Sequence, residues 1–162
     1  MNALPTPFRS LPTIADAPAV ERIVAATNFF NPAEVRIARE LVEERLARGE
    51  ASGYFFLFAD DGEERVGYSC FGPIDGTASS FDLFWIAVDP SRQGTGLGRR
   101  LMAASEREIA RMGGTRVYVE TSSREQYAPT RAFYLACGYQ EVAVLPEFYG
   151  PGDGKVIFCR VV

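Results

Sequence analysis

Three glycines at alternate positions are the feature of this sequence best suited to binding an anion. Gly94, Gly96 and Gly98 stand between an apolar run at 81–88, rich in strand-forming residues, and a segment at 99–111 with apolar residues at helical spacing. Glycine adopts backbone conformations closed to other residues and leaves no Cβ between a ligand and the backbone amides. Because the first N–H groups of a helix lack partners within the helix, the pattern predicts a phosphate-binding loop.

Of three other interpretations of this loop, two remain open and the nucleoside-triphosphate loop is excluded. A dinucleotide-binding fingerprint requires a third glycine where Arg99 stands and a tighter turn after the strand, although Glu120 ends the following strand, where a ribose-binding acid would fall. A nucleoside-triphosphate loop requires a lysine, and the only lysine is Lys155. A turn without a ligand is the third interpretation, and the arginines at 92, 99 and 100 argue against it.

The absence of histidine restricts the chemistry that the chain can perform. It excludes a histidine base, a serine–histidine–aspartate triad and the common zinc sites. Three cysteines, Cys70, Cys137 and Cys159, lie far apart in apolar segments, so we expect buried free thiols. No metal site is expected, and carboxylates and tyrosines remain as the acid–base groups.

The elements that must position these residues follow from the hydrophobic period along the chain. A strand is expected at 8–14, followed by a short helix that Asp16 caps and a second helix at 32–48, with Asn31 as cap and Glu34 at its third position. The remaining predicted elements are strands at 54–59, 65–71 and 81–88, a helix at 99–111, a strand at 116–121, a helix at 130–137, and strands at 139–145 and 156–162 joined by a loop at 146–154. The order β α α β β β α β α β β predicts one α/β domain over residues 1–162.

Length, charge and hydropathy narrow the range of partners. The 162 residues are 47% hydrophobic, which is enough for one domain with a substantial core. The formal net charge of −4 gives no general attraction to nucleic acid or to anionic lipid. No apolar run approaches the length of a membrane span, and the first ten residues lack the pattern of a signal peptide, so a cytoplasmic protein is expected.

Two motifs in this sequence resemble those of a known family. Residues 93–98, Gln-Gly-Thr-Gly-Leu-Gly, resemble the Gln/Arg-x-x-Gly-x-Gly/Ala pyrophosphate loop of the GNAT superfamily of acyl-CoA-dependent N-acyltransferases. Residues 133–139, Phe-Tyr-Leu-Ala-Cys-Gly-Tyr, resemble its Phe-Tyr-x-x-x-Gly-Phe segment, and the spacing and element order from about Phe8 to Val162 are similar. The resemblance implies a single GNAT-like domain with a mixed, mostly antiparallel sheet of about seven strands and helices on both faces.

The resemblance also implies acetyl-CoA, or coenzyme A, as the bound co-substrate. In the family, the loop amides hold the coenzyme pyrophosphate, and the preceding strand pairs its backbone with the pantetheine arm. The Val88 N–H would then point at the thioester carbonyl oxygen, where negative charge develops. The implied coenzyme contacts are Ile86, Val88, Gln93, Gly94, Thr95, Gly96, Leu97, Gly98 and Arg99.

The same resemblance suggests the catalytic groups. Tyr134 matches the family tyrosine that protonates the departing thiolate, and a packed helix tyrosine is the alternative. The base that takes the proton of the acceptor amine would be Asp82 or Glu120, although each could instead be a solvated or ion-paired residue and a water chain could replace both. Phe29 and Phe30, between the first two helices, and Tyr149, in the last hairpin, would bind the acceptor or anchor their loops.

The function implied is transfer of an acetyl group from acetyl-CoA to a primary amine by direct attack in a ternary complex. The acceptor would be a small molecule or a peptide, nucleic acid and membrane are not expected as partners, and the sequence leaves a homodimer open. One alternative is a protein that binds acyl-CoA without turnover, as a sensor or interaction module. A dinucleotide-dependent oxidoreductase is the other.

Overall fold

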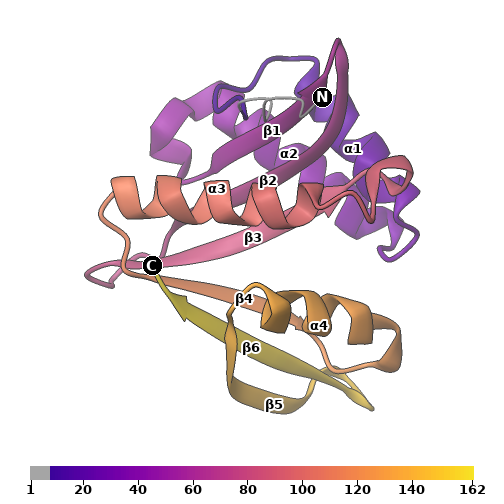
Figure 1. Cartoon of the computed structure of the whole chain (residues 1–162), viewed down its shortest axis with the longest axis vertical. Helices are drawn as coiled ribbons and strands as arrows, with labels where there is room; N and C mark the ends of the chain where they lie inside the picture. The colour runs from indigo at the N-terminus through magenta and orange to yellow at the C-terminus, as the bar shows by residue number, and fades with distance from the viewer. Residues whose placement is uncertain (1–7) are drawn as a thin grey trace. The chain divides into compact units, whose positions relative to one another are not determined.

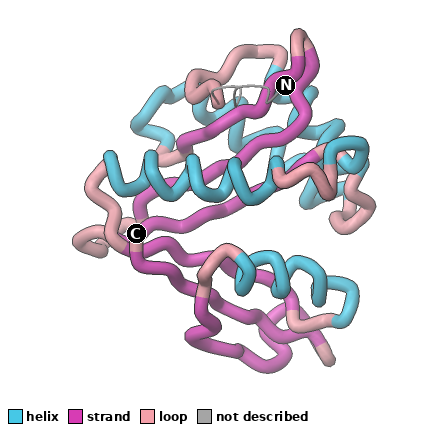
Figure 2. The backbone as a smooth tube through the Cα atoms, viewed as in Figure 1, coloured by secondary structure: helices cyan, strands magenta, loops and turns pink. Residues whose placement is uncertain are grey.

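The computed structural model describes residues 8–162, so the first seven residues of the expected 1–162 domain lie outside the described part. Within it the chain forms two compact units. Unit 1 comprises the chain up to Gly72 together with Trp85–Ser105, and unit 2 comprises Pro73–Phe84 together with Glu106–Val162. The strand β3 (Ser80–Val88) and the helix α3 (Leu97–Arg111) each have residues in both units. Figures 1 and 2 show the course of the chain through these elements.

Four α-helices and six strands lie in residues 8–162. They are α1 (Asp16–Ala26), α2 (Pro32–Arg48), β1 (Phe55–Asp61), β2 (Glu64–Pro73), β3 (Ser80–Val88), α3 (Leu97–Arg111), β4 (Arg116–Ser122), α4 (Ala128–Ala136), β5 (Gln140–Gly150) and β6 (Asp153–Val161). Short 3₁₀ turns occupy Gly49–Ser52, Pro90–Arg92 and Glu125–Tyr127.

The strands form one mixed sheet in the hydrogen-bonded order β1-β2-β3-β4-β6-β5. The pairs β1/β2, β4/β6 and β5/β6 are antiparallel, and β3 pairs with β4 in parallel. This confirms the mixed α/β fold, but the expected count of about seven strands is wrong for residues 8–162. The missing strand is the one predicted at 8–14, where only Arg9 bridges to Phe58. Pro12 has no N–H with which to continue that pairing.

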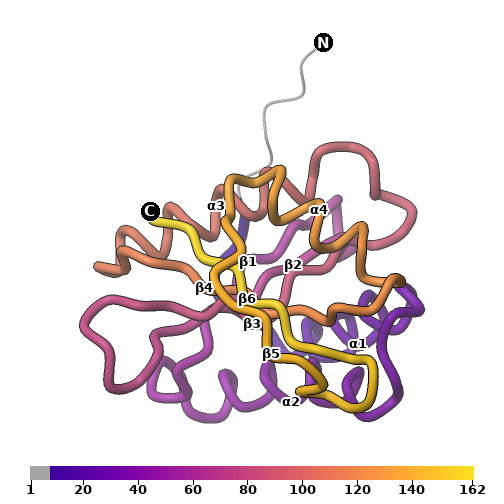
Figure 3. Tube along the Cα trace, turned by 90° about the horizontal axis from the view of Figure 1, so that it is seen from below, coloured from indigo at the N-terminus to yellow at the C-terminus, as the bar shows by residue number. Residues whose placement is uncertain are grey.

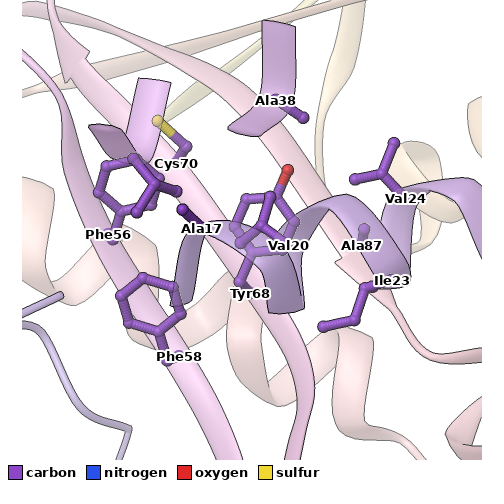
Figure 4. Close-up of a cluster of buried hydrophobic side chains, with 11 residues drawn as sticks. Ala17, Val20, Ile23, Val24, Ala38, Phe56, Phe58, Tyr68, Cys70 and Ala87 are labelled. Atoms are coloured by element: carbon purple, nitrogen blue, oxygen red, sulfur yellow. The ribbon is translucent and has the colours of Figure 1, made fainter. Parts of the chain in front are cut away.

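The core of unit 1 lies between the β1–β2 hairpin and the helices α1 and α2. Apolar side chains from all four elements, with Ala87 of β3, form one buried cluster (Figure 4). Its buried members are Ala17, Val20, Ile23, Val24, Ala38, Val42, Phe56, Phe58, Tyr68, Cys70 and Ala87. Ala59, next to Phe58 on β1, instead packs with Val66 and with Leu97 of α3. Because neighbouring residues of a strand face opposite sides, helices cover both faces of this hairpin, as expected.

The two N-terminal helices begin for different reasons. The Asn31 side chain accepts a hydrogen bond from the Glu34 N–H, and the Glu34 side chain accepts one from the Asn31 N–H, so the predicted capping box at α2 is confirmed. The prediction that Asp16 caps α1 is wrong, because the helix begins at Asp16 itself and Ala15 precedes it. The carboxylate of Asp16 instead accepts hydrogen bonds from Arg9 and Arg65.

The strands of unit 2 present one buried face and one more open face. Residues 80–82 of β3 pair with 116–118 of β4, and β4 pairs along its length with β6. Val117, Val119 and Phe158 are buried on one face, and Tyr134 of α4 packs on Phe158 with the ring centroids 5.7 Å apart. Asp82 lies beside Tyr118 in the register, so both belong to the opposite face, together with Glu120.

The last hairpin departs from the sequence expectation. The predicted loop at 146–154 is mostly strand, since β5 continues to Gly150 and β6 begins at Asp153. Figure 3 shows the path of the chain through β5 and β6 near the C-terminus. The register passes from Leu145 opposite Lys155 directly to Gly150 opposite Asp153, so residues 146–149 form a bulge facing Gly154. Proline at 146 lacks an N–H, and Glu147 has a φ of 55°, and both features favour an interruption of the pairing.

The cysteines also differ in part from expectation. None of the three forms a disulfide, but only Cys70 is buried, whereas Cys137 and Cys159 are partly exposed. Cys137 directly follows the last residue of α4, and Cys159 lies on the more open face of β6 opposite Tyr118. In residues 8–162 no helix is both long enough and apolar enough to span a bilayer.

Candidate functional site

The glycine loop leads from β3 into the first turn of α3. Gly94 and Gly96 have φ angles of 76° and 82°, the left-handed region that glycine adopts without strain. The helix begins at Leu97, two residues earlier than predicted, and its Arg100 N–H donates to the Gly96 carbonyl oxygen at 3.1 Å. Gly98 therefore lies within the helix. The N–H groups of Leu97 and Gly98 precede this first intrahelical bond, which is the position where helices bind anions.

Side chains of the loop brace its own backbone. The Thr95 hydroxyl donates to the Arg92 carbonyl oxygen at 2.6 Å, and the Gln93 amide donates to the Val88 carbonyl oxygen at 3.3 Å. Asp89 accepts hydrogen bonds from the N–H and the hydroxyl of Ser91, which hold the pKa of Asp89 below its usual value. With these side chains turned inward, the backbone amides are the groups that the loop offers to a ligand.

The space around the loop is open enough for a ligand. An ideal Cβ at Gly94 or Gly96 would have no other atom within 4 Å. A hollow of about 200 Å³ in unit 1 lies beside the loop. Its lining residues are Phe8, Ala59, Asp60, Asp61, Val66, Arg92, Thr95, Leu97 and Arg100. Arg92 forms an ion pair with Asp61 of β1, which ties the loop to the neighbouring hairpin.

The end of β3 and the connection between α1 and α2 hold the other expected residues of unit 1. Ile86 and Val88 are half-buried, and Val88 packs against the cluster of Ala59, Val66 and Leu97. Phe30 packs against Trp85 with the ring centroids 4.9 Å apart, so it partly anchors its connection, whereas Phe29 is 39% exposed. Sequence reasoning missed Trp85, although it is the only tryptophan and lies on the strand before the loop.

On the open face of unit 2, the structure brings together both candidate bases. The Glu120 carboxylate forms an ion pair with Lys155 of β6, with Oε2 and Nζ 2.8 Å apart. Burial raises the pKa of Asp82, the negative charge of Glu120 raises it further, and the positive charge of Lys155 acts in the opposite direction. Asp82 is therefore a half-buried carboxyl whose pKa lies above its usual value, next to an ion pair.

The β5 bulge places two aromatic rings against the same lysine. Lys155 Nζ lies 3.8 Å from the ring centroid of Phe148 and 5.8 Å from that of Tyr149. The two rings meet edge to face, with their centroids 5.1 Å apart. Tyr149 was expected in a loop but lies on the bulge of β5, and it is joined to Glu120 through Lys155. Lys155 itself was not predicted as a site residue, although a sole lysine in a strand is a visible signal.

The third catalytic candidate, Tyr134, lies apart from the two acids. Its ring packs on Phe158 and Tyr139, and the residue is 8% exposed. Burial raises the pKa of Tyr134 to about 12, so its phenol stays protonated at neutral pH. Phe158 and Lys155 are three residues apart on β6, so their side chains lie on opposite faces of the sheet. Tyr134 packs on Phe158 and therefore lies on the face opposite to Lys155, Asp82 and Glu120. The part of the chain that the structure describes contains no cluster of metal-binding side chains.

Comparison with known sequences gives one family match and a set of partial relatives. A family model described as the acetyltransferase (GNAT) domain matches residues 51–141, which include the glycine loop and Tyr134. The ribosomal protein bS18-alanine N-acetyltransferase of Escherichia coli strain K12 is 34% identical over 73 residues, covering 45% of this chain and 48% of that protein. The chain thus spans about half the length of the curated relatives that it matches.

Comparison with solved structures extends the likeness to nearly the whole chain. A crystal structure from Desulfovibrio desulfuricans, described as a GNAT-family acetyltransferase, has a TM-score of 0.94 and 44% identity, covering 95% of this chain and 97% of that chain. An aminoglycoside 6'-N-acetyltransferase complexed with coenzyme A has a TM-score of 0.76 and covers 96% of this chain and 97% of its own. At 20% identity, the second likeness concerns the fold alone.

Proposed function

The chain belongs to the GNAT acetyltransferase family, and we propose that it transfers an acetyl group from acetyl-CoA to a primary amine of a small molecule or a peptide. The observation that carries this proposal is the loop with Gly94 and Gly96 at positive φ, which opens onto the first turn of α3. Backbone N–H groups at a helix start attract a pyrophosphate through hydrogen bonds and through the helix dipole. Among the similar proteins, one acetylates an alanine of ribosomal protein bS18 and another acetylates an aminoglycoside.

Binding of the coenzyme would rest on the backbone of unit 1. We assign the pyrophosphate to the amides of residues 93–99 and the pantetheine arm to the main chain of Ile86 and Val88. The Val88 N–H would stabilise the negative charge that develops on the thioester oxygen during attack. Substitution of the Val88 side chain should therefore affect turnover less than a distortion of its backbone.

The acid–base steps would fall to residues of unit 2. The amine nitrogen bonds to the acetyl carbon as the carbon–sulfur bond breaks, so the ammonium of the acceptor must first lose a proton and the thiolate must gain one. Asp82 or Glu120 would take the first proton. Tyr134 would supply the proton that the thiolate gains, and the nitrogen loses a second proton as the amide forms, which balances it. Burial raises the pKa of Tyr134 to about 12, so its phenol is protonated at neutral pH. Phe29, Phe30 and Tyr149 are the proposed contacts of the acceptor body.

Thermal unfolding with acetyl-CoA, coenzyme A and NAD in parallel tests the coenzyme site. A ligand at about a hundred times its Kd should stabilise the fold by about 2.7 kcal/mol, which raises the Tm by several degrees. Gly96→Val should abolish the shift given by the coenzyme A ligands, because a side chain would occupy the anion site. Gly76→Val is the matched control, since Gly76 also has a positive φ and open space around its Cβ position but lies in another loop.

Thiol release with a panel of primary amines tests turnover. Tyr134→Phe should lower kcat with little change in coenzyme affinity. Tyr139→Phe is the control, because it removes a hydroxyl from a neighbouring buried ring, and it should not lower kcat selectively in this way. Coenzyme binding without product from any amine would favour a non-catalytic acyl-CoA sensor. A shift with NAD alone would overturn the proposal in favour of a dinucleotide site.

A further inference from the structure

We infer that Lys155 is a positioning residue, which holds Glu120 in an ion pair and thereby leaves Asp82 as the carboxylate that takes the proton of the acceptor. This inference rests on the proposed acetyl transfer, because it assigns roles within that site. It starts from the contact of Lys155 Nζ with Glu120 Oε2 at 2.8 Å and with the Phe148 ring at 3.8 Å.

The surroundings of Lys155 favour a persistent ion pair. Its side chain is only 14% exposed, although the Glu120 side chain is 44% exposed. The Phe148 ring covers the ammonium, and a cation near an aromatic face is attracted by the ring quadrupole. A pair with one partner shielded from water is screened less by salt than a fully exposed pair.

The charged groups that act on Asp82 come from two neighbouring strands. Glu120 of β4 raises the pKa of Asp82, Lys155 of β6 lowers it, and burial is the largest cause of the net increase. Tyr118, beside Asp82 in the register, is neutral, and the pKa of its phenol is raised mainly by Cys159. If the lysine cation is lost, two carboxylates share the site without a counterion, and the more buried one takes up a proton more readily.

The residue type is informative as well. Lys155 is the only lysine in the chain, and every other cationic side chain is an arginine. An ammonium is a compact point charge, whereas a guanidinium is a wide planar fork that favours two-point contacts. A lysine at this position therefore suits a single carboxylate oxygen under an aromatic ring.

Carbon-13 NMR titration of the side-chain carboxyls tests the pairing without any need for activity. Lys155→Met should raise the pKa of Asp82, Glu120→Gln should lower it, and the double variant should return it close to the wild-type value. Lys155→Arg keeps the positive charge and should give a smaller change than Lys155→Met. If Lys155→Met leaves the pKa of Asp82 unchanged while Glu120→Gln shifts it, the inference is overturned.

The pH profile of kcat/KM tests the assignment of Asp82 as the base. A base works in its deprotonated form, so activity falls as the pH drops below its pKa, and Lys155→Met should move this acid limb to higher pH. Arg124→Met is the matched control, because it removes a cation that pairs with Asp153 of the same hairpin at 3.2 Å. Arg124→Met should leave the acid limb of the kcat/KM profile at the same pH as in the wild type.

The two proposals fail in distinguishable ways. Asp82→Asn should remove the acid limb together with most of the turnover, and loss of the limb in Glu120→Gln instead would make Glu120 the base and overturn the inference. An absence of acetyl-CoA binding or of acetylated product in the wild type would reject the proposed function. The carboxyl titrations would still decide whether Lys155 sets the ionisation of Asp82.

Discussion

Replacement of Asp16 by asparagine should destabilise the fold in a way that depends on pH. The Asp16 side chain is fully buried at the start of α1, where it accepts hydrogen bonds from both terminal nitrogens of Arg9, at 2.8 and 2.9 Å, and from Arg65 Nε at 2.8 Å. The Thr13 N–H donates to the same carboxylate at 2.6 Å. These contacts fasten the segment before α1 to the β1–β2 hairpin, because Arg9 also pairs with Asp60.

The size of the effect follows from the pKa of this carboxyl. Burial by itself would raise it, but the hydrogen bonds from Arg9, Thr13 and Arg65 outweigh burial and hold the pKa of Asp16 at about 2, against an ordinary value of 3.8. Each pKa unit corresponds to about 1.4 kcal/mol, so ionised Asp16 contributes about 2 kcal/mol to the free energy of unfolding. Because the pKa of Asp16 is lower in the folded state than in the unfolded state, this contribution is complete above pH 3.8 and is lost as the pH falls through about 2.

Urea unfolding of the wild type, Asp16→Asn and Asp75→Asn over a series of pH values measures the contribution. At pH 7, Asp16→Asn should lower the free energy of unfolding by about 2 kcal/mol, and this difference should shrink as the pH is lowered towards 2. Asp75 is an exposed loop carboxylate, and its replacement should change little at any pH. A difference between wild type and Asp16→Asn that stays constant across the range would refute the electrostatic account.

Three further substitutions test packing and capping. Tyr68→Phe should raise the free energy of unfolding by about 1 kcal/mol, and with it the Tm, because the buried Tyr68 hydroxyl has no hydrogen-bond partner among the described residues (Figure 4). A fall in Tm would contradict this and would indicate that a buried water binds the hydroxyl. Asn31→Ala should lower the free energy of unfolding by about 1 kcal/mol, because the α2 cap is lost. An unchanged midpoint in urea unfolding would contradict this. Gly114→Ala should lower the free energy of unfolding by about 1–3 kcal/mol, since the new Cβ would lie 2.7 Å from Phe81 Cδ2. Gly150→Ala is the control, because the space around its Cβ is open, and it should leave the free energy of unfolding nearly unchanged.

The parts of the site that could be predicted from sequence are those fixed by local backbone requirements. Gly94 and Gly96 were recognisable because a left-handed turn before a helix requires glycine. The α2 cap was recognisable because Asn31 and Glu34 stand three residues apart at a helix start. Both signals depend on neighbouring residues alone.

The parts that sequence reasoning missed depend on register between distant strands. The contact of Lys155 with Glu120 requires β6 to lie beside β4 in one register, and nothing local to either residue specifies that register. The placement of Phe148 over Lys155 requires the β5 bulge, which brings four residues opposite Gly154. The separation of Tyr134 from the acids depends on which face of the sheet each side chain occupies.

The lack of histidine leads to a last prediction, about the acceptor. A carboxylate base has a pKa several units below that of an alkyl ammonium, so proton transfer from the acceptor is unfavourable in free energy even to Asp82, with its raised pKa.

At pH 7 an α-amine with a pKa near 8 is neutral in about one molecule in ten, and a lysine side chain with a pKa near 10.4 is neutral in roughly one in a thousand. A lysine-free peptide with a free N-terminus should therefore show a kcat/KM on the order of 100-fold higher than an N-terminally blocked peptide with one lysine. The ratio should fall as the pH rises from 7 to 10, because a growing fraction of the lysine amine is then neutral in solution. A ratio that does not change with pH would mean that loss of the acceptor proton does not limit kcat/KM.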